Sequence, residues 1–324
     1  MMHPVLMLGG SGQAGSSTAA MLRDWYPDLP LTIAGRDLAR AQGVADTLGT
    51  ATATTTDLSR QDLGLAEATS YSAVVATVWD QHLHGLRYAQ DHGIPYLSIS
   101  SGLTDIAPEV IATAQRPTTA PILLASHWAA GAITLVALEA AREFGPVETI
   151  EITAILDDQD AGGPASATDM ERLADASPAA LIRENGTFRW IADTATKVEG
   201  LDGTTLPGQY VGILDVPSLA LATGAPNVRF AFAMGESTGR RHQGTPSHDV
   251  RIRLSTASRT TTHNFTHPGG QRPVTAAGIA LGVERLLTLQ GTPVAPGIHS
   301  PESLINPTHA LTRLQSTGAL LTQH

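Results

Sequence analysis

The feature that most constrains this chain is a glycine-rich stretch directly after its first apolar run. The run "PVLML" at 4–8 is followed by Gly9, Gly10, Gly12 and Gly15, and an alanine-rich segment of helical character comes next. The spacing Gly10-x-Gly12-x-x-Gly15 is that of a dinucleotide-binding turn, and Gly9-x-x-Gly12-x-x-Gly15 fits as well. A purely structural turn is the alternative. The position after a first strand and before a helix favours a nucleotide loop.

Each glycine of such a loop has a physical task. The first permits a tight turn, the second lets the backbone approach a pyrophosphate, and the third lets the helix pack close to the strand. The phosphates then face free N–H groups at the positive end of the helix. The predicted cofactor contacts in the loop are Gly10, Ser11, Gly12, Gln13, Ala14 and Gly15.

Residues 1–125 alternate between apolar strand-like runs and segments of helical spacing. Alternation of this kind indicates a parallel, doubly wound sheet of the Rossmann type, in the α/β class. The expected strands are 4–8, 31–35, 51–57, 73–78 and 95–100, and the expected helices between them include 14–24 and the segment "LARAQGVADTLG", which stops at Gly49.

The end of the second strand indicates which dinucleotide binds. In "AGRD", Arg36 can pair with a 2′-phosphate, whereas a carboxylate aimed at that position would repel it. The alternative is that Arg36 merely precedes the next helix, with Asp37 as its N-cap. Both can hold together, and the pattern favours NADP.

Topology alone suggests further contacts at the ends of the later strands. Asp57 and Leu58 are placed to flank the adenine, and Thr77 and Val78 to run beside the nicotinamide ribose. Ser100, after the fifth strand, is expected at the same edge of the sheet.

Several segments together resemble the saccharopine dehydrogenase family, and most closely its short bacterial members. They are "VLMLGGSGQAGSSTAAML", "LTIAGRDLARAQGVADTLG", "GIPYLSISSG" and the tail "PGIHSPESLINPTHALTRLQSTG". The resemblance covers the first hundred and the last fifty residues. It implies an NADP-binding Rossmann domain, an α/β substrate domain, and a C-terminal return to the first domain, with Gly10, Gly12, Gly15 and Arg36 as cofactor contacts.

The chain length of 324 residues indicates two domains. We expect the NADP-binding domain over 1–125, a smaller α+β substrate and dimerisation domain with a mixed or antiparallel sheet over 126–272, and returning C-terminal helices over 273–324. In the second domain, 147–156, 187–192 and 228–234 are expected strands, and "HDVRIRLST" with "RTTTHNFTH" an antiparallel pair. An amphipathic helix is expected over 274–290 and a final helix over about 307–317, capped by Asn306.

The candidate for proton transfer is His127, which follows the apolar run "PILLA" near the domain junction. A buried histidine satisfied by the backbone is the alternative. Trp128 could wall the nicotinamide or belong to the core. Arg240, Arg241 and His242 could bind a substrate carboxylate or form a solvated loop. We expect Thr77, Ser100 and His127 to line one cleft.

Composition excludes several classes of site. There is no cysteine, so disulfides, thiolate metal sites and cysteine nucleophiles are ruled out. Twelve histidines remain, but none has zinc-protease spacing, and His82 and His84 are expected to diverge on a helix face, so no metal is predicted. The net charge of −10 without a basic run argues against nucleic acid. No signal sequence or membrane span is recognisable, which predicts a cytoplasmic protein.

Two functions from different classes remain. One is an NADP-dependent oxidoreductase that transfers hydride to or from a small imine, secondary amine or carbonyl compound. The other is a non-catalytic NADP(H)-binding sensor of redox state. The substantial second domain favours the enzyme, and we expect it to form a homodimer through that domain.

Overall fold

The computed structural model describes residues 2–67, 69–116, 119–160, 162–176 and 178–324. The chain forms two compact units, each of which is described by itself. Unit 1 consists of 1–126, 163–169 and 276–305, and unit 2 of 127–162, 170–275 and 306–324.

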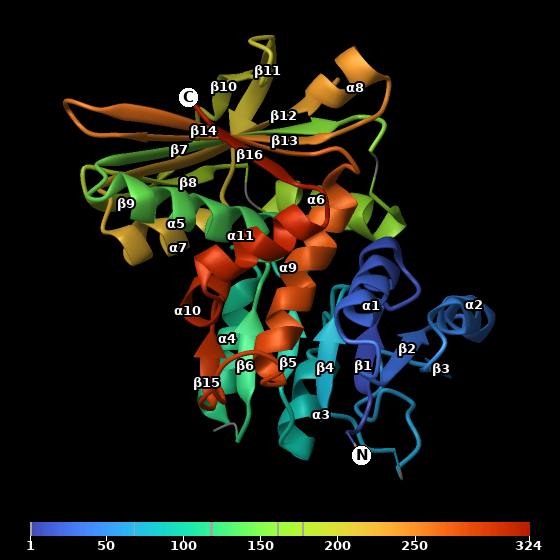
Figure 1. Ribbon diagram of the computed structural model, residues 1–324. Helices are drawn as coiled ribbons and strands as arrows, with labels where there is room; N and C mark the ends of the chain where they lie inside the picture. Colours follow the sequence, from blue (N-terminus) through green and yellow to red (C-terminus); the bar gives the residue numbers. More distant parts are fainter. Residues whose placement is uncertain (1, 68, 117–118, 161, 177) are drawn as a thin grey trace. The chain divides into compact units, whose positions relative to one another are not determined.

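Unit 1 is built on a seven-stranded sheet in which every pairing is parallel. This confirms the expected doubly wound sheet (Figure 1). Its order is β15-β6-β5-β4-β1-β2-β3, with β1 (Val5–Leu8), β2 (Leu31–Gly35), β3 (Ala51–Thr55), β4 (Ala73–Ala76), β5 (Tyr96–Ser98), β6 (Pro121–Leu124) and β15 (Gly297–His299).

The central strands are buried on both faces because helices cover both. Every residue of β1, β2 and β4 is buried, as expected for short apolar runs in a parallel sheet. The helices α1 (Gln13–Trp25), α2 (Leu38–Leu48), α3 (His84–His92) and α4 (Ile106–Gln115) lie between successive strands, whereas the described residues between β3 and β4 form no helix.

A late segment of the chain completes unit 1. The helix α9 (Gln271–Leu286) is buried from Ala276 to Glu284, so the expectation of an amphipathic helix was wrong. Gly282 allows close packing on the sheet, since a Cβ there would stand 2.5 Å from Leu97 Cδ1. Glu284 accepts a hydrogen bond from the Tyr26 hydroxyl at 2.6 Å. The strand β15 and the short α10 (Pro301–Leu304) follow.

Unit 2 is built on a mixed nine-stranded sheet, which matches the predicted class. The order along its main path is β10-β11-β12-β7-β13-β14-β16, with β8 paired to β12 and β9 to β8. Its strands are β7 (Thr149–Asp157), β8 (Ala180–Glu184), β9 (Thr187–Ile191), β10 (Ala195–Glu199), β11 (Thr205–Tyr210), β12 (Asn227–Gly235), β13 (His248–Ser255), β14 (Thr260–His267) and β16 (Leu320–Gln323).

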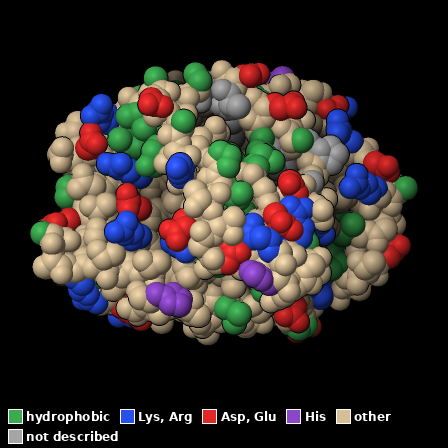
Figure 2. Space-filling model, turned by 90° about the horizontal axis from the view of Figure 1, so that it is seen from above, with side chains coloured by type: hydrophobic (Ala, Val, Ile, Leu, Met, Phe, Trp, Pro, Cys, Tyr) green, Lys and Arg blue, Asp and Glu red, His purple; other side chains and the backbone are tan. Residues whose placement is uncertain are grey.

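Helices pack on one face of this sheet (Figure 1), and Ile150 and Ile152 of β7 are buried. The opposite face carries charged pairs such as Arg253–Glu151, and in Figure 2 hydrophobic side chains form only small, separate groups. The helical elements are the 3₁₀ turn η1 (Trp128–Gly131), α5 (Ala132–Phe144), α7 (Asp215–Thr223), α8 (Thr238–Gln243) and α11 (Pro307–Ser316), and α6 (Pro164–Ala176) has residues in both units.

The C-terminal segment differs from the expected single return to the first domain. Residues 276–305 belong to unit 1, whereas 306–324 belong to unit 2. The physical reason is that β16 adds an antiparallel strand to β14. The start of α11 was predicted correctly: Asn306 caps it by accepting from the His309 N–H at 3.1 Å, and Pro307 occupies the first turn.

Candidate functional site

The glycine loop lies at the carboxyl end of β1, and its tight turn falls on Gly9. Gly9 has a φ of +76°, and a Cβ on it would stand 2.4 Å from Val78 Cγ1 and 2.9 Å from Thr77 Oγ1. Only glycine adopts this conformation in so little space. The turn role expected of Gly10 therefore belongs to Gly9, which supports the spacing that starts there.

The other loop glycines differ in how closely neighbouring atoms surround them. A Cβ on Gly10 would stand 2.8 Å from the Met7 carbonyl oxygen, and one on Gly15 only 2.4 Å from the Gly9 carbonyl oxygen. Gly15 thus lets α1 pack close to the loop, as predicted. Gly12 is less restricted, because its nearest neighbour would be the Gly9 carbonyl oxygen at 3.2 Å. Packing alone therefore does not require glycine at position 12.

The N-terminus of α1 is suited to an anion. Gly12 is its N-cap residue and provides no side-chain hydrogen bond, and the first turn holds no acidic residue. The first hydrogen bond of the helix runs from Ser16 N–H to the Gly12 carbonyl oxygen. The N–H groups of Gln13, Ala14 and Gly15 come before this bond in the helix. With the helix dipole, these groups attract negative charge.

The end of β2 brings Ser11 close to the predicted phosphate-binding residue. Gly35 leaves room for Ser11, whose Oγ would be 2.9 Å from a Cβ on Gly35. The next residue, Arg36, is exposed and forms no ion pair within the described part of the chain. Asp37 caps α2 by accepting from the Arg40 N–H at 3.1 Å. This confirms Asp37 as the N-cap of α2, and the pairing of Arg36 with a 2′-phosphate stays a prediction.

Asp57 and Leu58 follow β3, and each makes contacts within unit 1. Asp57 is exposed, and Ser59 donates to its Oδ1 from both the backbone N–H (2.9 Å) and the hydroxyl (2.7 Å), which lowers the pKa of this carboxyl group. Leu58 is half-buried against the core of unit 1, and its carbonyl oxygen is 2.9 Å from His84 Nδ1.

The residues predicted at the ends of β4 and β5 follow neighbouring strands. Thr77 is buried and donates its hydroxyl to the Leu8 carbonyl oxygen at 2.9 Å, which ties the end of β4 to the end of β1. Together with Val78 it borders Gly9. Ser100 is half-buried after β5, beside Ser101, whose N–H donates to Ser126 Oγ at 3.0 Å. The structure thus brings the loop, Thr77 and Val78 into contact.

In unit 2, His127 lies in a buried polar group. Its Nε2 atom is 2.8 Å from Ser218 Oγ, and both side chains are largely buried. The alternative considered for His127 was satisfaction by the backbone, whereas the structure shows a side-chain partner. The fully buried Asp215 accepts from the Trp128 N–H at 2.8 Å and from the Thr134 hydroxyl at 2.6 Å.

Trp128 packs among aromatic residues of unit 2. Its ring centroid is 5.0 Å from that of Phe230, and its Nε1–H donates to His248 Nε2 at 3.2 Å. Burial lowers the pKa of His248 to about 4, so this ring is neutral near pH 7 and can accept the bond. Of the two roles considered for Trp128, these contacts support a place in the core.

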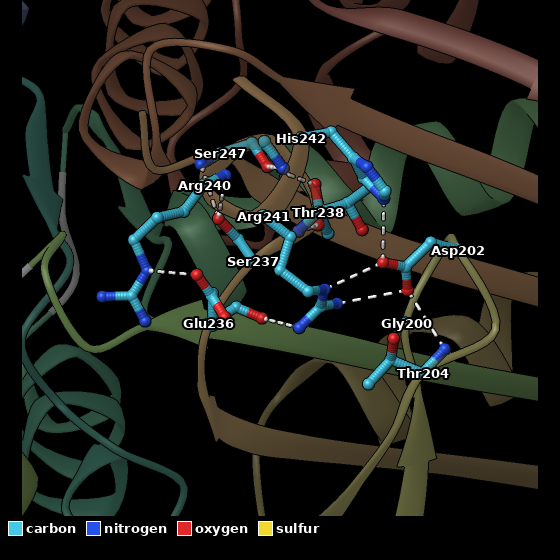
Figure 3. A network of polar contacts seen from close by, with 12 residues as sticks. Gly200, Asp202, Thr204, Glu236, Ser237, Thr238, Arg240, Arg241, His242 and Ser247 are labelled. Carbon is cyan, nitrogen blue, oxygen red and sulfur yellow. Dashed lines mark hydrogen bonds and ion pairs between the residues drawn. The ribbon is translucent and has the colours of Figure 1, made fainter. Parts of the chain in front are cut away.

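The basic group at 240–242 does not fit either of its expected roles. Arg241 binds Asp202 with two nitrogens, at 2.8 and 3.2 Å, and His242 contacts the same carboxylate at 3.2 Å (Figure 3). Arg240 pairs with Asp157 at 3.3 Å and with Asp158 at 2.6 Å. Through these ion pairs, the side chains link α8 to neighbouring strands and loops. A substrate carboxylate would have to displace carboxylates of the chain itself.

The histidine pair expected to diverge does the opposite. The rings of His82 and His84 stack with centroids 5.3 Å apart, because His82 precedes α3 and only His84 belongs to it. Among the described residues, no group of three or more histidine or acidic side chains could hold a metal ion. No helix in the described ranges is long and apolar enough to cross a bilayer.

Sequence reasoning missed three buried polar residues. Ser218 contacts His127, and Asp215 contacts the next residue, Trp128, across about ninety residues of chain, and no local sequence pattern predicts these contacts. Glu109 lies in the first turn of α4, and burial raises its pKa. In "TDIAPEV" the acidic residue stands in the first turn of a helix, where acidic residues commonly interact with the helix dipole, so the sequence gives no sign of its burial.

At the level of the fold, the chain resembles solved dehydrogenases. It aligns with saccharopine dehydrogenase (L-Glu forming) from Saccharomyces cerevisiae at a TM-score of 0.67 and 14% identity, over 99% of both chains. A myo-inositol dehydrogenase from Corynebacterium glutamicum aligns at 0.51 and 16% identity, over 98% of this chain and 96% of that one. A scyllo-inositol dehydrogenase from Lactobacillus casei, solved with NAD(H) and scyllo-inositol, aligns at 0.51 and 12% identity, over 99% of both.

No model of a known protein family matches the sequence, and no curated protein matches it. Identities this low establish a common fold. The resemblance expected from the sequence is confirmed at that level: the chain has the fold of saccharopine dehydrogenase.

Proposed function

We propose that this chain is an NADP-dependent oxidoreductase that acts on a small imine, secondary amine or carbonyl substrate. The observation that carries the proposal is the glycine loop at the carboxyl end of β1, which presents the uncapped N-terminus of α1. In doubly wound sheets this edge is where dinucleotides bind. The common fold with named dehydrogenases supports the reaction class.

The residues of unit 1 fit NADP. The N–H groups that follow Gly12 would hold the pyrophosphate, and Gly12 leaves the approach open. Arg36 would pair with the 2′-phosphate, with the Ser11 hydroxyl beside it at the end of β2. When bound, NADP(H) supplies the hydride chemistry, and the protein supplies orientation and a proton.

We assign the proton transfer to His127. A histidine titrates near neutral pH and suits transfer to an amine or alkoxide. His127 directly follows Ser126, whose hydroxyl accepts from Ser101 just beyond β5. Ser126, the residue before His127, is thereby held beside the segment that follows β5 in unit 1.

The experiment is a panel of keto acids, imines and small carbonyl compounds, assayed for steady oxidation of NADPH. Turnover with at least one compound is the expected result. Tight NADPH binding without turnover across the panel would instead support the sensor of redox state. Absence of NADPH binding would contradict both.

We also propose a homodimer formed through unit 2. Two large apolar side chains on β9 support it: Phe188 is 38% and Trp190 50% exposed, and β9 pairs only with β8 among the described strands. Exposed aromatic residues of this kind are enriched at interfaces. Light scattering at micromolar concentration should give a dimer mass, and Trp190→Glu should shift it toward the monomer. A monomer mass for the unaltered chain would contradict the proposal.

A further inference from the structure

Two residues of α7 form hydrogen bonds to the segment that contains His127. Ser218 contacts the ring, with its Oγ 2.8 Å from His127 Nε2. One turn earlier on the same helix, Asp215 accepts from the backbone N–H of Trp128, the residue after His127, at 2.8 Å. The ring and the adjoining backbone are therefore both tied to α7.

The backbone that follows Trp128 has an unfavourable conformation that depends on such contacts. Ala129, Ala130 and Gly131 all have positive φ angles, of 49°, 54° and 86°. Two of these residues carry a Cβ, and the left-handed conformation is unfavourable for such residues. A turn of this kind persists only when its surroundings impose it.

Asp215 accepts a hydrogen bond at each end of this turn. One carboxylate oxygen accepts from Trp128 N–H before it, and the other accepts from the Thr134 hydroxyl in the first turn of α5 after it, at 2.6 Å. Asp215 is fully buried, and its position by the N-terminus of α5 is favourable for a carboxylate. Burial raises the pKa of Asp215 above its ordinary value, and the hydrogen bonds from Thr134 and Trp128 offset this only in part.

We propose that Asp215 and Ser218 are positioning residues for His127. Asp215 fixes the left-handed turn that carries the histidine backbone, and Ser218 fixes the orientation of the ring. A group that transfers a proton must stand within hydrogen-bond reach of its target, so a loosely held ring would lose rate. This inference rests on the proposed function, because it takes His127 as the proton-transfer group.

The test compares Ser218→Ala with two matched variants. Ser218→Thr keeps the hydroxyl, and Thr223→Val removes a hydroxyl from the same helix without touching His127, since Thr223 bonds to the Leu219 carbonyl oxygen. Steady-state kinetics should show that Ser218→Ala lowers kcat by about tenfold or more, with KM for NADPH unchanged. Ser218→Thr and Thr223→Val should keep kcat close to that of the unaltered chain.

A second readout does not depend on activity. The imidazole signals of His127, identified in NMR spectra by their loss in His127→Gln, should form one sharp set in the unaltered chain. They should broaden or shift in Ser218→Ala, and also in Thr134→Val, which removes one tie of Asp215. Unchanged signals and unchanged kcat in Ser218→Ala would overturn the inference. If the unaltered chain has no turnover, the proposed function fails, and the signals alone decide the positioning.

Discussion

Gly9 and Val78 lie so close together that a Cβ atom on Gly9 would stand 2.4 Å from Val78 Cγ1. The end of β1 and the end of β4 therefore meet where only a hydrogen atom fits. Gly9→Ala should destabilise the chain by about 2–4 kcal/mol, because steric overlap adds to the left-handed φ. Chemical denaturation measures this.

Gly43→Ala provides the control for that variant. Gly43 lies inside α2, and no atom stands within 4 Å of its Cβ position. The substitution should raise the free energy of unfolding by about 0.5–1 kcal/mol through helix propensity. Equal stability of the Gly9 and Gly43 variants would contradict the geometry of the loop.

Much of unit 1 could be predicted from sequence because its strands are short apolar runs separated by helical spacing. β1, β2 and β4 are buried throughout, so periodicity and burial agree. The same reasoning failed for α9, whose Glu284 looks like a solvent-facing residue but is buried against the Tyr26 hydroxyl. A partner more than two hundred residues away leaves no local signal.

The candidate site divides in the same way. The glycine loop and the Asp37 cap depend on neighbours in sequence, and the cap and the packing role of Gly15 were predicted correctly. The partners of His127 and Arg241 come from distant elements. Whether an arginine faces solvent, a substrate or Asp202 depends on tertiary packing, which spacing does not encode.

Replacement of Arg36 should alter the choice of cofactor. We expect the unaltered chain to bind NADPH more tightly than NADH by about 2 kcal/mol, the strength of a charge-assisted hydrogen bond. Arg36→Ala should remove this preference and leave NADH affinity unchanged, as measured by titration of both cofactors. Equal affinities in the unaltered chain, or a preference that survives in Arg36→Ala, would refute the assignment.

Removal of the Arg241 side chain should affect stability and leave catalysis intact. Arg241 and Asp202 are 17% and 15% exposed, so Arg241→Ala leaves a largely buried carboxylate without its guanidinium partner and should cost about 1–3 kcal/mol. Arg253→Ala is the control, because its pair with Glu151 is long and exposed and should contribute about 0.5 kcal/mol or less. A large rise in substrate KM in Arg241→Ala would restore the substrate-binding role.

Stability should fall on mild acidification because of His248. Burial depresses its pKa from 6.5 to about 4, so the unfolded chain binds the proton at a higher pH than the folded one. This contribution is fully present above pH 6.5 and is lost as the pH falls through about 4, on the order of 3 kcal/mol. Denaturation at a series of pH values should show a shallower slope in His248→Gln, and an unchanged slope in the exposed His3→Asn. Identical slopes in all three would count against a neutral buried His248.

The most direct test of the nucleotide site is calorimetric titration of NADPH into the unaltered chain and into Gly12→Ala. Gly12 has an ordinary φ of −78°, and its Cβ would meet only the Gly9 carbonyl oxygen, at 3.2 Å. The fold should therefore survive, with an unchanged denaturation midpoint, while the new methyl group obstructs the approach of the pyrophosphate. We predict NADPH binding to the unaltered chain and a loss of about tenfold or more in affinity in Gly12→Ala. No binding to the unaltered chain, or equal affinity in the two proteins, would contradict a nucleotide site at this loop.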